Sequence, residues 1–240
     1  MKILAVSDKD DSKLQACILQ NCKFLHDIDI VISCGDISNQ YLEFLADSLK
    51  KPLFFVKGNH KNFHPSDQKG YLDKFISDLY DSDKQFINGG VNLHARIEPY
   101  GDYIIIGFEG SMKYNSGPSQ YTQQEMTKIV KKIETALYLV QLKDSILGRK
   151  QKKIIVVSHA PVAGIHDQPD LCHQGFARFK NFINKFKPAV WLHGHIHFND
   201  QRDAQITKIE NTLVVNAYGF HIVDINDDNI KVVSNTKNFL

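Results

Sequence analysis

The sequence has few cysteines, no long apolar run and little net charge, and each absence excludes a class of protein. Its four cysteines include no C-x-x-C pair, so we expect reduced thiols and no thiolate zinc site. No apolar run approaches the length of a membrane span, and the charged start MKILAVSDKDD lacks the features of a secretory signal. A net charge of +2 gives no indication of nucleic-acid binding. We therefore expect a cytoplasmic protein with no membrane partner, for which nucleic acid is only a secondary possibility.

The first half of the chain alternates short apolar runs with amphipathic stretches. A composition of 42% hydrophobic and 23% charged residues is typical of a globular protein. The apolar runs predict strands, and the intervening stretches carry apolar residues at helical spacing. This rhythm favours parallel strands covered by helices. We expect strands at 3–6, 28–33, 53–56 and 104–106, and helices near 14–25, 41–49 and 72–79.

The second half contains the longest predicted helix and then a series of short strands. Thr122 and Glu125 have the spacing of a capping box, and Gly148 is a plausible helix end. Further strands are expected at 154–157 and 189–192, with helical spacing over 173–187 between them. Apolar runs at 205–209, 213–216, 221–225 and 230–234 predict antiparallel hairpins. No repeat or linker divides the chain, so residues 1–240 are interpreted as one α/β domain with two sheets.

Five of the apolar runs end in residues that can bind metal ions. In open α/β sheets, ligands bind at the carboxyl ends of the strands, so these side chains are expected to meet. Carboxylate, amide oxygen and imidazole together suit divalent manganese, iron or zinc. Glycines before three of them allow the backbone to turn tightly. The residues are Asp8 with Asp10 and Asp11 nearby, Asp36, Asn59 with His60, His159, and His195 with His197.

The motifs S-D-K-D, G-D-I-S, G-N-H-K, S-H-A-P and G-H-I-H follow one another between Asp8 and His197. This series resembles the calcineurin-like metallophosphoesterase superfamily, in particular its small prokaryotic-type members. The resemblance implies a four-layer αββα sandwich, in which two β-sheets are flanked by helices and the trailing hairpins belong to the second sheet. It also implies hydrolysis of a small phosphomonoester or phosphodiester by metal-activated hydroxide, without a covalent enzyme intermediate.

The resemblance further implies a role for each motif residue. Asp36 would bridge two divalent ions, and Asp8 and His197 would complete the shell of the first. The second ion would be held by Asn59, His159 and His195. His60 would be the acid that steadies the leaving oxygen, and we count it with Asn59 as catalytic.

The first motif departs from the family pattern, because Asp10 stands where the family has histidine. Asp10 could ligate as a carboxylate, Asp11 could replace it, the first ion could be weakly held, or either aspartate could simply cap the next helix. An added carboxylate lowers the net positive charge of a site that holds two divalent ions, and we expect this to favour hard ions such as manganese or magnesium. We therefore favour manganese among manganese, iron, zinc and magnesium. Lys61, in place of an acid after His60, is a minor change.

Two alternatives remain open from the sequence. A non-catalytic interaction scaffold could reuse the fold with a weakened first metal site, or a one-metal hydrolase could use only the site of Asn59, His159 and His195. The loops 109–120 and 161–175 are expected to shape the pocket, since both follow motif strands. His64, His166 and His173 could touch substrate or lie at the surface, and His193 is interpreted as a buried or partner-bonded histidine. The sequence does not set the oligomeric state.

Overall fold

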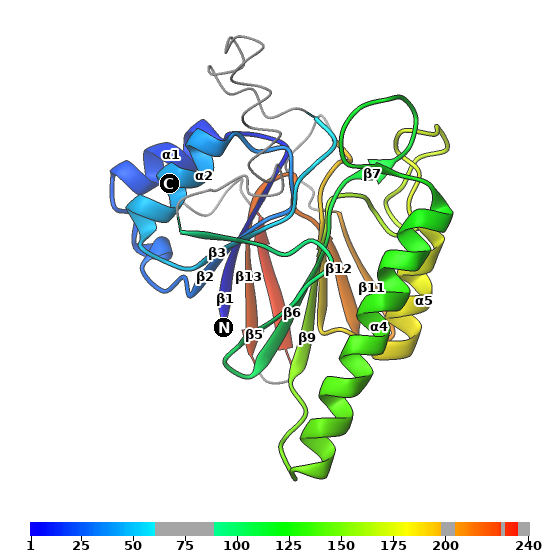
Figure 1. Cartoon of the computed structure of the whole chain (residues 1–240). Coiled ribbons are helices and arrows are strands. Elements are labelled where there is room, and N and C mark those ends of the chain that lie inside the picture. Colours follow the sequence, from blue (N-terminus) through cyan, green and yellow to red (C-terminus); the bar gives the residue numbers. More distant parts are fainter. Residues whose placement is uncertain (61–88, 198–204, 227–228, 235–240) are drawn as a thin grey trace, which may run out of the picture.

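Two six-stranded mixed sheets form the centre of the molecule in the computed structural model, which describes residues 1–60, 89–197, 205–226 and 229–234 (Figure 1). The first sheet has the order β14-β13-β1-β2-β3-β4, and the second has the order β11-β12-β10-β9-β6-β5. The first sheet consists of β1 (Lys2–Ser7), β2 (Ile30–Ser33), β3 (Leu53–Phe55), β4 (Gly90–Asn92), β13 (Gly219–Asn226) and β14 (Asn229–Ser234). The second consists of β5 (Ile97–Tyr100), β6 (Tyr103–Phe108), β9 (Lys153–Ser158), β10 (Val190–His193), β11 (Ile206–Ile209) and β12 (Thr212–Asn216).

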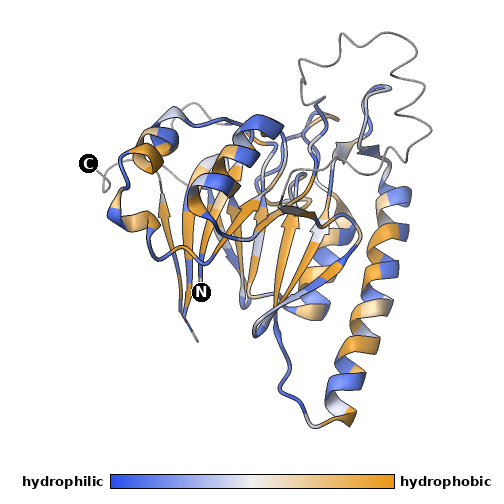
Figure 2. Ribbon diagram, turned by 60° about the vertical axis from the view of Figure 1, so that its left-hand side comes forward, coloured by the Kyte–Doolittle hydropathy of each residue, from blue (hydrophilic) through white to orange (hydrophobic). Residues whose placement is uncertain are grey.

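Helices cover the outer face of each sheet, so the fold has the four layers expected of an αββα sandwich. The helices α1 (Ser12–Leu19) and α2 (Asn39–Leu49) lie against the first sheet, and α4 (Gln123–Ile146) and α5 (Ala177–Phe186) lie against the second. Between the sheets, Ile3 and Ile32 of the first pack with Val157 and Leu192 of the second. Figure 2 shows the predominantly apolar strands between helices that carry both polar and apolar residues. The predicted fold class is confirmed.

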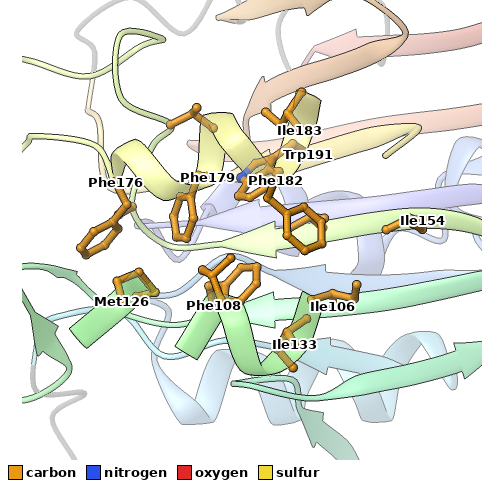
Figure 3. Packing of buried hydrophobic residues seen from close by; sticks show 14 of the residues in the cluster. Ile106, Phe108, Met126, Ile133, Ile154, Phe176, Phe179, Phe182, Ile183 and Trp191 are labelled. Atoms are coloured by element: carbon orange, nitrogen blue, oxygen red, sulfur yellow. The ribbon is translucent and has the colours of Figure 1, made fainter. Parts of the chain in front are cut away.

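An aromatic cluster fixes the ends of β6, β9 and β10 against the second helical layer. The rings of Phe108, Phe179 and Trp191 lie with centroids 5.0–6.2 Å apart and are fully buried (Figure 3). The Trp191 indole donates a 2.9 Å hydrogen bond to Ser158 Oγ. Each such side chain contributes roughly 1.5–3 kcal/mol of burial free energy. The residues that follow β9 and β10 are therefore placed by a rigid core.

Helix starts follow the local sequence closely. Thr122 and Glu125 form the predicted capping box at the start of α4. Asp11 caps α1 by accepting hydrogen bonds from Lys13 N and Leu14 N, and Ser38 caps α2 through Tyr41 N. The helix expected from 14 to 25 is shorter than predicted, because α1 ends at Leu19 and a 3-10 turn, η1 (Lys23–Leu25), follows.

The C-terminal hairpins are antiparallel as predicted, but their assignment to the second sheet is only half right. The pair β11–β12 extends the second sheet, whereas β13–β14 joins the first through antiparallel pairing of β13 with β1. The short strands β4 and β5 were not predicted, because neither carries a continuous apolar run. Two further short strands, β7 (Ser111–Met112) and β8 (Gln120–Tyr121), pair within the loop expected over 109–120. The helix expected near 72–79 lies outside the described residues.

No described helix combines the length and the apolar content that crossing a membrane requires.

Candidate metal centre

The five motif segments follow the carboxyl ends of β1, β2, β3, β9 and β10. The strands β1, β2 and β3 run parallel in the first sheet, and β9 and β10 run parallel in the second. The segments of the two sheets meet at one edge of the sandwich: His195 N donates a 2.8 Å hydrogen bond to Asp8 Oδ2, and His159 Nδ1 lies 2.8 Å from Cys34 O. The predicted convergence of the strand ends is therefore seen in the fold.

The backbone turns sharply at this edge. Asp8, Asp36 and His195 have positive φ values of 61°, 53° and 69°. Left-handed backbone at a non-glycine residue costs about 1–3 kcal/mol and tends to occur at functional sites. Two glycines in the motif segments allow neighbouring segments to pack closely. A Cβ on Gly58 would collide with the Asp36 carboxylate, and one on Gly194 would collide with Ser7 Oγ.

Four residues form what we call the inner group: Asp36, Asn59, His159 and His195. His159 Nε2 lies 2.9 Å from Asn59 Oδ1 and 3.2 Å from Asp36 Oδ2. The ring centroids of His159 and His195 are 4.8 Å apart. Asn59, His159 and His195 are buried, with exposed fractions of 3%, 0% and 4%. Side chains from four strand ends thus share one enclosed place.

Each inner histidine is oriented by a backbone carbonyl. His159 Nδ1 lies 2.8 Å from Cys34 O, and His195 Nε2 lies 2.9 Å from Cys172 O. A neutral imidazole that donates one N–H to a carbonyl presents its other nitrogen as a lone pair, as metal-ligating histidines do. His195 Nδ1 is then available to an ion, and so is His159 Nε2 once that ring has lost its proton.

Within the inner group, the negative charge of Asp36 and the positive charge of His159 stabilise each other. Burial alone raises the pKa of Asp36, but the positive charge of His159 outweighs it and lowers this pKa to about 2. Burial alone lowers the pKa of His159, but the Asp36 charge outweighs it and raises this pKa to about 9. Burial and the charge of His159 lower the pKa of His195 to about 4. At neutral pH, Asp36 is a carboxylate and His159 is protonated.

The outer group comprises Asp8, Asp10, His60 and His197. Asp8 Oδ2 accepts a 2.8 Å hydrogen bond from His195 N, and Asp8 Oδ1 lies 3.3 Å from His197 Nε2. Burial raises the pKa of Asp8, but the hydrogen bond from His197 and the charge of His159 outweigh it, so the net shift is downward. His60 and His197 are exposed, and His60 N donates to Asp36 Oδ1 at 3.1 Å. Asp8 and His60 therefore contact the inner group directly.

Asp10 and Asp11 are both engaged elsewhere. Asp10 accepts hydrogen bonds from Ser38 N at 3.1 Å and from Ser38 Oγ at 2.6 Å, through different oxygens. Asp11 caps α1, which was one of the interpretations left open from the sequence. A metal-ligating role of Asp10 stays a prediction, and it requires the carboxylate to turn away from Ser38.

Tyr114 and Cys172 contact the inner group, although no motif identified them. Asn59 Nδ2 donates a 3.0 Å hydrogen bond to Tyr114 Oη, which orients the amide oxygen toward His159. Cys172 Sγ lies 3.9 Å from His195 Nε2. A cysteine side chain therefore lies beside this group, although Cys172 belongs to none of the motifs in the sequence. Both residues lie in the two loops predicted to shape the pocket, and that loop assignment was the only available signal.

The remaining histidines of these loops differ in their surroundings. His166 Nδ1 lies 2.9 Å from His193 Nε2, and His166 Nε2 lies 2.8 Å from Thr207 Oγ1. His193 is fully buried, as the partner-bonded interpretation predicted. His173 lies beside His195, with ring centroids 5.2 Å apart and the ring planes tilted by 35°. His64 lies outside the described residues.

The inner group fits a divalent ion. Asp36 Oδ2 is buried and makes no hydrogen bond, despite its 3.2 Å contact with His159. A buried carboxylate oxygen without a donor is costly unless a cation completes it. Two ligands at right angles around an ion about 2.1 Å away lie roughly 3 Å apart, and the inner oxygen–nitrogen separations are 2.9 and 3.2 Å. Ligand atoms of Asp36, His159 and His195 all lie within 4.8 Å of one another.

Comparisons with known proteins agree with this arrangement. The sequence profile of the calcineurin-like phosphoesterases matches residues 1–199, and the chain belongs to this family. Family membership supports a general role in phosphoester hydrolysis.

Solved structures share the fold at low identity. The chain resembles protein TT1561 of Thermus thermophilus at a TM-score of 0.56 and 14% identity, covering 97% of this chain and 98% of that one. A dimetal phosphatase from Danio rerio gives a TM-score of 0.56 at 12% identity, covering 98% and 95%. A search of curated protein sequences finds no match.

Proposed function

We propose that the protein is a dinuclear metal-dependent phosphoester hydrolase. The observation that carries the proposal is the buried Asp36 oxygen without a hydrogen bond, which lies next to His159 Nε2, the atom that also contacts Asn59 Oδ1. Asp36 would be shared by two ions. The inner group would hold one of them, and Asp8 and His197 of the outer group would hold the other.

Two divalent ions held here would supply Lewis-acid charge for a phosphoryl oxygen and would lower the pKa of a water toward neutrality. The residues of the chain prepare that chemistry. Asp36 is ionised at neutral pH, because its pKa is lowered to about 2. Tyr114 fixes the Asn59 amide, so its oxygen rather than its nitrogen faces the inner group. His60, exposed beside Asp36, would give a proton to the leaving oxygen.

The substrate that we propose is a small phosphomonoester or phosphodiester, and manganese is the favoured ion. Carboxylate, amide and imidazole ligands accept manganese, and the carboxylates Asp8 and Asp36 favour a hard ion. We also propose a cytoplasmic location, because all four cysteines are free thiols.

The test is hydrolysis of p-nitrophenyl phosphate and of its bis-ester by metal-free protein given manganese, zinc, iron or magnesium. Wild type should turn over at least one ester with a preferred ion. Asp36→Asn should lose at least about 100-fold, more than the 10–100-fold typical of residues that only support ligands. Asp224→Asn, on the strand β13, is the matched control and should keep full activity. Activity that survives in Asp36→Asn would remove the bridging role.

A one-ion hydrolase is the second candidate, favoured by the hydrogen bonds between Asp10 and Ser38. With Asp10 held there, the outer position has fewer ligands than the inner one. Elemental analysis of the active protein distinguishes one bound ion per chain from two. Stoichiometric metal binding without turnover of any ester would instead favour the non-catalytic scaffold.

A further inference from the structure

A second cluster of metal-ligating side chains lies on the other side of His195. It consists of Cys172, His173 and His195, whose ligand atoms all lie within 4.8 Å of one another. Cys172 and His173 belong to the loop between β9 and α5, and His195 follows β10. Cys172 and His173 are partly exposed, so an ion from solvent can reach them.

The spacing of this cluster is close to that of a tetrahedral zinc site. Zinc lies about 2.3 Å from thiolate sulfur and about 2.0–2.1 Å from imidazole nitrogen, which puts the two ligands roughly 3.6 Å apart. Cys172 Sγ and His195 Nε2 are 3.9 Å apart. A small side-chain adjustment therefore brings both atoms onto one ion. The 2.9 Å contact of His195 Nε2 with Cys172 O would be exchanged for the ion.

An independent observation concerns Asp170. Its two carboxylate oxygens lie 2.8 and 2.9 Å from His173 Nδ1. Metal-ligating histidines commonly donate one ring N–H to a carboxylate, which fixes the tautomer and leaves the other nitrogen for the ion. Asp170 also accepts from His173 N at 3.3 Å. The loop thus orients His173 as a ligand whose Nε2 is available.

We propose that Cys172, His173 and His195 form a thiolate-containing cation position that takes zinc in preference to manganese. A soft thiolate selects zinc, whereas the carboxylate and amide of the inner group accept harder ions. Three protein ligands leave a fourth position for water or another oxygen ligand. The position requires neither Asp36 nor hydrolytic activity, so it goes beyond the proposed function.

The two positions compete for His195. A neutral imidazole offers one lone pair, so the ring serves either the inner group through Nδ1 or Cys172 through Nε2. Zinc at the thiolate position should then weaken ion binding by the inner group. Excess zinc should lower manganese-supported activity in wild type and do so less in Cys172→Ser.

The decisive experiment is a cobalt titration of the metal-free full chain, followed by near-ultraviolet absorption. Thiolate coordination gives an intense sulfur-to-cobalt charge-transfer band that nitrogen and oxygen ligands do not give. Wild type and Asp36→Asn should show the band, and Cys172→Ser should not. Cys22→Ser, which alters another partly exposed thiol, is the matched control and should retain it. Asp170→Asn should lower zinc affinity about 10–100-fold, as expected for a residue that supports a ligand.

The result separates this proposal from the proposed function. A band in wild type that persists in Asp36→Asn supports the thiolate position, whether or not any ester is hydrolysed. No band in wild type, or an equal band in Cys172→Ser, overturns it even if the enzyme is fully active. Circular dichroism of each variant shows that the fold is retained.

Discussion

The inner and outer groups differ in whether every carboxylate oxygen already accepts a hydrogen bond. In the outer group, Asp8 contacts His195 N and His197 through separate oxygens, and both oxygens of Asp10 accept from Ser38. In the inner group, Asp36 Oδ2 is buried with no hydrogen bond. An ion entering the inner group gives this oxygen a partner and displaces the proton of His159, whereas an ion entering the outer group must displace the hydrogen bonds of both its carboxylates. We therefore expect the inner position to bind more tightly and to dominate activity.

The largest effect should come from exchanging one histidine in each group. His159→Gln removes a fully buried ligand and should lower ion affinity and hydrolysis at least about 100-fold. His197→Gln removes an exposed one and should cost about 10-fold; both magnitudes are scaled to the 10–100-fold loss known for supporting residues. Metal titration and kcat/KM measure both. Equal losses in the two variants would contradict the difference between the groups.

A second effect concerns pH. The pKa of His159 is raised to about 9 in the metal-free protein, so at pH 7 the ring holds a proton that an entering ion must displace. Apparent ion affinity should rise about tenfold per pH unit from pH 7 toward pH 9, then level off. Calorimetry in buffers of different ionisation enthalpy should detect the released proton. His159→Gln should flatten this slope, and an unchanged slope there would assign the proton to another group.

A smaller effect is expected at Tyr114. Tyr114→Phe removes the hydroxyl that accepts from Asn59 Nδ2, so the amide loses its fixed orientation. Ion affinity should fall about 10-fold, the lower end for a supporting residue. Tyr218→Phe is the matched control: it keeps the ring that contacts His197, with centroids 5.0 Å apart, and should leave the inner position unchanged. A loss that is confined to KM would assign Tyr114 to substrate rather than to Asn59.

The smallest effect should come from Asp10→Ala. Its hydrogen bonds to Ser38 are exposed, so their loss should lower the free energy of unfolding by about 0.5–1 kcal/mol. The number of ions bound per chain should not change. A loss of one ion per chain would show instead that Asp10 leaves Ser38 to act as a ligand. Asp10→His, which restores the residue found in the family pattern, should then recover that ion.

Much of this site could be predicted, because its residues directly follow strands that can be recognised from the sequence. Asp36, Asn59, His159 and His195 each follow a short apolar run, and parallel pairing brings such ends to one edge. The order of the strands within each sheet could not be predicted. Strand β13 pairs with β1 although more than two hundred residues separate them in the sequence. The local sequence of neither strand indicates which strand it pairs with.

The loop residues were beyond sequence reasoning for a related reason. Tyr114, Cys172 and His173 are placed by loop conformation, which has no periodicity to follow. The role of Asp10 depends on Ser38, a residue that caps a different helix. In both cases the deciding contact joins segments that only the folded chain brings together.

The most direct test is a crystal of the protein soaked with manganese, with anomalous scattering used to locate the ion. We predict a peak coordinated by Asp36 Oδ2, Asn59 Oδ1 and His159 Nε2, at about 2.0–2.2 Å from each. Manganese bound elsewhere in the crystal, with no peak within reach of these three atoms, would contradict the assignment of the inner group as the metal centre.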